Sequence, residues 1–85
     1  MFQVLYVDDE PELLQIGKIF LERHGKFRVD TAASASEGLK LLESGNYEAI
    51  VSDYLMPVMD GIAFLKAIRA SSAVSLPRLV ALVRE

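Results

Sequence analysis

The chain has 85 residues, a formal net charge of −3 and a hydrophobic fraction of 52%. This length suits one small domain, and the negative charge argues against direct binding of DNA or RNA, because proteins that bind them are usually basic. The absence of cysteine excludes disulfides and thiolate metal sites, and no apolar run approaches the roughly 18 residues of a membrane span. We therefore expect one cytoplasmic domain over residues 1–85 that binds neither nucleic acid nor membrane.

The first predicted strand covers residues 1–7, a short apolar run that suits a strand buried on both faces. The strand ends at Asp8, and Pro11 is well placed as the first residue of a helix with Asp9 or Glu10 as its N-cap. Two apolar stripes then repeat at helical spacing: Leu13, Ile16 and Phe20, and Leu14, Gly17 and Leu21. Cations followed by a glycine at residues 23–25 predict the end of this helix.

A second strand is predicted at residues 27–33, where apolar and polar side chains partly alternate. Ser34 and Glu37 then match the S-x-x-E capping box, which predicts that a second helix begins there. This helix is expected to stop at residues 44–46, and a third strand at residues 47–52 ends at another acid, Asp53.

Residues 53–60 are expected to form a loop, and a third helix begins at Gly61 with Phe64, Leu65 and Ile68 on its apolar face. A connection rich in small residues leads to a fourth predicted strand at residues 79–83. Strands that alternate with helices through short connections predict an α/β fold, in which helices cover both faces of a parallel sheet.

Three aspartates follow predicted strands, Asp8 and Asp9 after the first and Asp53 after the third. If these strands are neighbours, the carboxylates converge at the carboxyl edge of the sheet, where ligands of such folds bind. Three like charges repel unless a cation neutralises them, and a site made only of oxygen ligands suits Mg²⁺. A Mg²⁺ beside a carboxylate suggests phosphoryl transfer, with the carboxylate as nucleophile.

Two segments resemble the receiver domains of response regulators of the CheY type. Residues 7–11 read Val-Asp-Asp-Glu-Pro, like the opening of that family. Residues 53–61 read Asp-Tyr-Leu-Met-Pro-Val-Met-Asp-Gly, almost identical to its phosphoacceptor segment. The resemblance holds to about residue 77 and implies a flavodoxin-like sheet of order 2-1-3-4. Relative to the family, the fifth strand and the last two helices are missing.

The resemblance also implies a role for each matching residue. Asp53 is the expected phosphoacceptor, which takes a phosphoryl group from a histidine kinase. Asp9 is expected to bind Mg²⁺ directly and Asp8 mainly through water, while Leu55 contributes its backbone carbonyl. Receivers also carry a Ser or Thr at the end of the fourth strand, a position that falls here at Leu82 or Val83, and neither has a hydroxyl.

Three hypotheses for function follow. The first is a phosphoacceptor signalling module that is not an enzyme and assists only its own phosphorylation and dephosphorylation. The second is a degenerate receiver that acts only as a protein-interaction module. The third and weakest is an aspartyl phosphatase, because Leu55 stands where such enzymes place a second acid. A free edge at the fourth strand and an uncovered sheet face also predict a homo-oligomer.

Overall fold

The computed structural model describes residues 2–53, 61–70 and 79–83. Strands and helices alternate along the chain: β1 (Phe2–Val7), α1 (Pro11–Glu22), β2 (Phe27–Ala32), α2 (Ala35–Ser44), β3 (Ala49–Asp53), α3 (Gly61–Ala70) and β4 (Leu79–Val83). The strands form one parallel sheet in the order β2-β1-β3-β4. The flavodoxin-like architecture and the strand order that the sequence predicts are therefore confirmed.

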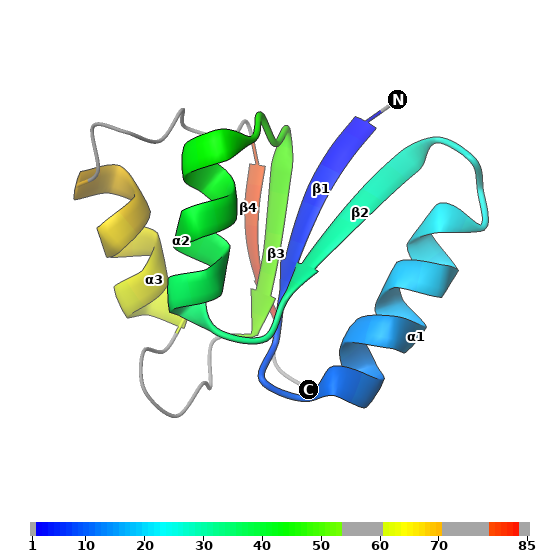
Figure 1. The fold of residues 1–85 in the computed structure, drawn as a ribbon, viewed down its shortest axis with the longest axis horizontal. Coiled ribbons are helices and arrows are strands. Elements are labelled where there is room, and N and C mark those ends of the chain that lie inside the picture. Colours follow the sequence, from blue (N-terminus) through cyan, green and yellow to red (C-terminus); the bar gives the residue numbers. More distant parts are fainter. Residues whose placement is uncertain (1, 54–60, 71–78, 84–85) are drawn as a thin grey trace.

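The helices lie on both faces of the sheet, with α1 on one face and α2 and α3 on the other (Figure 1). The larger core lies on the side of α2 and α3 and joins both helices to the centre of the sheet through Leu5, Val7, Ala32, Ala35, Leu42, Ile50, Phe64 and Ile68. The smaller core lies under α1 and is centred on Val4, Val29 and Ala49. None of the described helices is long and apolar enough to cross a membrane.

Local signals set most of the helix ends as expected. The Ser34 hydroxyl accepts a hydrogen bond from the Glu37 backbone N–H at 3.2 Å, so the capping interaction at the start of α2 is confirmed. Gly25 follows α1 with a φ of +72°, a conformation that strongly favours glycine and ends the helix. Glu10 is the N-cap residue of α1, but the expected side-chain cap is wrong, because the Glu10 side chain makes no capping hydrogen bond.

Contacts between elements fix how α1 lies on the sheet. Lys18 Nζ donates to the Val29 carbonyl at 2.8 Å, and Glu22 Oε2 accepts from the Val29 N–H at 2.9 Å. Since β2 is an edge strand of the described sheet, these bonds satisfy backbone groups that would otherwise be open to another strand. Gly17 allows close packing on Tyr6, because a Cβ at residue 17 would lie 2.9 Å from Tyr6 Cδ2 and still closer to Cε2.

Tyr47 ties the start of β3 to β2 at the other end of the sheet. Its hydroxyl donates to Asp30 Oδ2 at 2.6 Å, across the intervening strand β1. Burial, together with this hydrogen bond to Asp30, raises the pKa of the Tyr47 hydroxyl to about 12. The predicted third strand at residues 47–52 is therefore shifted: β3 begins at Ala49 and runs through Asp53.

Candidate functional site

The carboxyl ends of β1 and β3 bring the predicted acids to one edge of the sheet. These two strands are parallel neighbours, and Val7 and Ser52 are Cα partners at their ends. Asp8 and Asp53 each come one residue further along the chain, so the register places their backbones level with each other. The expected convergence of the first and third strands is therefore seen in the backbone, while the side-chain positions at residue 53 lie outside the described part.

Asp8 is a fully buried carboxylate. Its backbone N–H donates to the Ala32 carbonyl at 3.1 Å, which holds the residue against the end of β2. Oδ1 accepts a hydrogen bond from the Glu10 N–H at 2.9 Å, whereas Oδ2 has no hydrogen-bond partner among the described residues. A buried carboxylate oxygen without a partner is unfavourable, and a cation would relieve this cost. Asp8 therefore fits a site for Mg²⁺.

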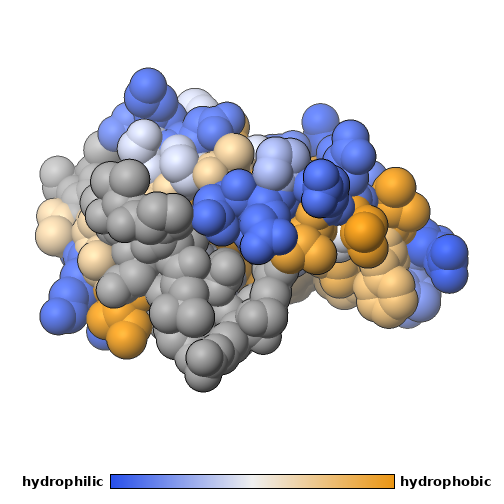
Figure 2. Space-filling model, turned by 90° about the horizontal axis from the view of Figure 1, so that it is seen from below, coloured by the Kyte–Doolittle hydropathy of each residue, from blue (hydrophilic) through white to orange (hydrophobic). Residues whose placement is uncertain are grey.

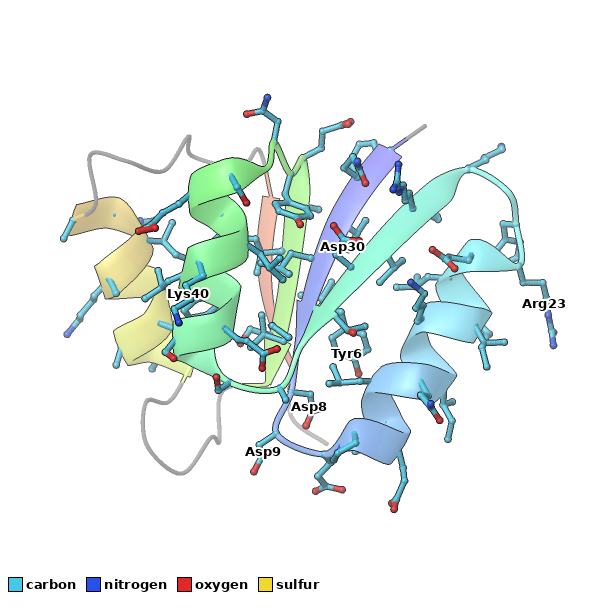
Figure 3. The ribbon with its side chains drawn as sticks, in the orientation of Figure 1. Tyr6, Asp8, Asp9, Arg23, Asp30 and Lys40 are labelled. Atoms are coloured by element: carbon cyan, nitrogen blue, oxygen red, sulfur yellow. The ribbon has the colours of Figure 1, made fainter. Side chains whose placement is uncertain are left out.

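Asp9 differs from its neighbour, because its side chain is exposed. Figure 3 shows both aspartates beyond the end of β1, where the chain turns into α1. Within residues 2–53, 61–70 and 79–83, no group of three or more acidic or histidine side chains is close enough to hold a metal ion. The expected backbone ligand Leu55 lies outside the described residues.

The register of β4 bears on the hydroxyl that the sequence lacks. Asp53 and Val83 are Cα partners, whereas Leu82 is the partner of Ser52. Of the two positions considered from sequence, Val83 is therefore the one that lies level with the predicted phosphoacceptor. Valine has no hydroxyl, so this position cannot donate a hydrogen bond from its side chain.

Sequence reasoning gave no attention to Ser52, which is fully buried immediately before Asp53. A single hydroxyl in an otherwise apolar strand was the available signal. Its Cα partner on β1, Val7, belongs to the larger core, so Ser52 lies at a register position on the side of α2 and α3. We therefore regard it as part of the support beneath the strand end.

Comparison with known proteins identifies the relatives of this fold and site. The family described as response regulator receiver domain matches residues 4–83. Response regulator Rre1 of Synechocystis is 41% identical over 66 residues, which cover 78% of this chain and 29% of that protein. Transcriptional regulatory protein SrrA of Staphylococcus aureus is 34% identical over 67 residues, covering 79% of this chain and 27% of that protein. The chain thus spans less than a third of these curated relatives.

Solved structures give the same result. The chemotaxis response regulator CheY4 of Vibrio cholerae superposes with a TM-score of 0.78 at 38% identity, over 86% of this chain and 60% of that one. A chain in the crystal structure of histidine kinase ThkA in complex with response regulator protein TrrA gives a TM-score of 0.80 at 30% identity, over 99% of this chain and 69% of that one.

Proposed function

Because the chain belongs to the response regulator receiver domain family, we propose that it accepts a phosphoryl group from a histidine kinase onto Asp53. The observation that supports this most strongly is the register that sets Asp53 level with the buried Asp8 at the carboxyl edge of the sheet. A carboxylate oxygen of Asp53 would attack the phosphorus of a phosphohistidine. The phosphorus–nitrogen bond would break, the imidazole would leave, and an aspartyl phosphate would form.

Asp8, Asp9 and Asp53, together with the backbone carbonyl of Leu55, are the groups that we propose to hold Mg²⁺. The buried Asp8 Oδ2, which has no partner among the described residues, supports this assignment. When bound, the cation would neutralise negative charge between the carboxylates and the phosphoryl oxygens. Asp8 itself would supply a fixed negative charge, because its burial and its bond to the Glu10 N–H hold it in place.

The proposed module is a signalling domain and not an enzyme acting on other substrates. It would assist only its own phosphorylation and the later hydrolysis of the acyl phosphate. We propose residues 1–85 as one receiver domain, with a sensor histidine kinase as its phosphodonor. The complex of ThkA with TrrA among the structural relatives supports a partner of this kind. Self-association through the edge of β4 or the sheet face beside α1 is the second expected interaction.

A second function is favoured by one observation, the pairing of Asp53 with Val83. Without a hydroxyl at this position, the phosphoryl group would lack one of the bonds that couple it to a conformational change in receivers. Under this hypothesis the chain keeps the receiver fold and acts only as a protein-interaction module.

Phosphorylation by a small donor separates the two functions. The protein is incubated with acetyl phosphate and Mg²⁺, and its intact mass is measured beside Asp53→Asn and Glu43→Gln, the latter an exposed carboxylate on α2. We expect the wild type and Glu43→Gln to gain one phosphoryl group and Asp53→Asn to gain none. No gain in the wild type would favour the interaction module, and an equal gain in Asp53→Asn would contradict the assignment of Asp53.

A further inference from the structure

Helix α1 carries a stripe of exposed apolar side chains. Ile16, Ile19 and Phe20 are 64%, 65% and 59% exposed, although each is large and hydrophobic. They stand at positions i, i+3 and i+4, so they lie together on one face of the helix. Single exposed apolar residues are ordinary, but a contiguous set on one helix face indicates an interaction surface. Figure 2 shows hydrophobic surface at the end of the molecule that α1 occupies.

The fold does not use this stripe, because the other side of α1 makes the contacts with the sheet. Leu14 is buried, and Leu21 packs against the smaller core. Gly17 lies against Tyr6, and Lys18 and Glu22 bond to Val29 on β2. The stripe therefore remains available to another molecule while α1 stays docked.

Opposite charges stand at the two ends of the stripe. Glu12 precedes Ile16 by four residues, and Arg23 follows Ile19 by four residues. Both charged side chains are exposed, and neither makes a hydrogen bond or an ion pair within the described residues. Arg23 points away from the body of the protein in Figure 3. The order acid, isoleucine, isoleucine, base is thus symmetric about the middle of the helix.

This symmetry matches a second copy of the same helix. We propose that α1 packs antiparallel against α1 of a second copy about a two-fold axis, a contact distinct from the proposed phosphoryl chemistry. Ile16 of each copy would then contact Ile19 of the other, and Glu12 would pair with Arg23 at both ends. A self-complementary patch of this kind is what a two-fold homodimer requires.

The surroundings of α1 favour a helix-to-helix contact over extension of the sheet. The edge of β2 lies beside α1, and its Val29 backbone groups are already bonded to Lys18 and Glu22. A second copy that approached from this side would meet a blocked strand at residue 29 and an open apolar helix. The contact would be small, so we expect a weak dimer that forms in the range of about 10–100 µM.

Charge reversal tests the pairing directly. Sedimentation velocity over a range of concentrations gives the dimer dissociation constant for the wild type, Glu12→Arg, Arg23→Glu and the double variant. We expect each single reversal to weaken the dimer about five- to ten-fold, since it places like charges opposite each other. The double reversal should recover most of the wild-type affinity, because both pairs become attractive again. It cannot do so through helix stability, since both new charges oppose the helix dipole.

Matched controls separate the stripe from other surfaces. Ile16→Glu is expected to abolish dimerisation, while Ile62→Glu, at an isoleucine of α3 that is 54% exposed, and Lys40→Glu on α2 should leave it unchanged. Circular dichroism and thermal unfolding check that each variant is folded. A monomer at the highest concentration, or a double reversal no tighter than the weaker single variant, would overturn the proposal. So would variants that reduce phosphotransfer from a histidine kinase but leave self-association intact.

Discussion

Asp53 and Val83 are Cα partners at the ends of two neighbouring parallel strands, β3 and β4. Valine therefore takes the position level with the proposed phosphoacceptor, where receivers of this type carry a hydroxyl. The acidic side of the site and the side that would respond to phosphorylation thus differ in how closely they follow the family pattern.

Val83→Thr is the first prediction, because it restores a hydroxyl at this position. One added hydrogen bond to the phosphoryl group is worth about 1 kcal/mol, or roughly five-fold in a conformational equilibrium. We expect the variant to show larger NMR shift changes on phosphorylation than the wild type. Leu82→Thr is the matched control, since Leu82 is level with Ser52 and not with Asp53. Equal responses in both threonine variants would contradict the assignment of position 83.

Asp8→Asn tests the buried carboxylate. Without metal we expect the variant to unfold at a higher temperature, with a gain on the order of 1 kcal/mol, because a buried charge is removed and the bond to the Glu10 N–H is kept. Saturating Mg²⁺ should stabilise the wild type and have little effect on the variant. Thermal unfolding with Mg²⁺ and with EDTA measures both effects. A wild type that does not respond to Mg²⁺ would remove the basis for a metal site at Asp8.

Gly17→Ala tests the contact between α1 and β1. Alanine has the higher helix propensity by about 1 kcal/mol, but its Cβ would overlap the Tyr6 ring. We expect the overlap to dominate and to lower the free energy of unfolding by about 1–3 kcal/mol. Chemical denaturation measures the change, with Gln15→Ala on the exposed side of the same helix as control. A more stable Gly17→Ala would show that the helix moves away from Tyr6 at little cost.

Tyr47 predicts a pH dependence at the opposite end of the sheet. The pKa of its hydroxyl is raised from 10.0 to about 12, so the folded state keeps the proton that the unfolded state loses first. The stabilisation is complete below about pH 10 and is lost as the pH rises towards 12. We expect the free energy of unfolding to fall over this range.

Tyr47→Phe is the matched variant, and it removes the bond to Asp30. We expect it to be less stable by about 1 kcal/mol at neutral pH and to show a shallower fall above pH 10, measured by denaturant titrations at each pH. Identical pH profiles for the two proteins would show that another group accounts for the loss.

The alternation of apolar runs and helical stripes was sufficient to predict the sheet, because each element carries its own local signal. Leu79–Val83 has the bounds that its apolar run predicts, and the Ser34 cap follows from residues three positions apart. The choice between the two stripes of α1 could not be made from sequence, since both are apolar. Only the packing of Leu14 and Leu21 shows that Ile16 and Phe20 face outward.

The site shows the same division. Adjacent acids at positions 8 and 9 look equivalent in sequence, but successive side chains after a strand point in opposite directions, and only Asp8 is buried. Contacts such as Tyr47 with Asp30 depend on strand register, which the sequence pattern does not specify. The choice of Val83 over Leu82 depends on that register as well.

The central claim is that Asp53 accepts the phosphoryl group. After incubation with acetyl phosphate and Mg²⁺, reduction with borohydride converts an aspartyl phosphate to homoserine, and peptide mass spectrometry locates the modified residue. The account predicts homoserine at position 53 and at no other acid. Homoserine at Asp8 or Asp9, or none anywhere in a protein shown to be folded, would contradict it.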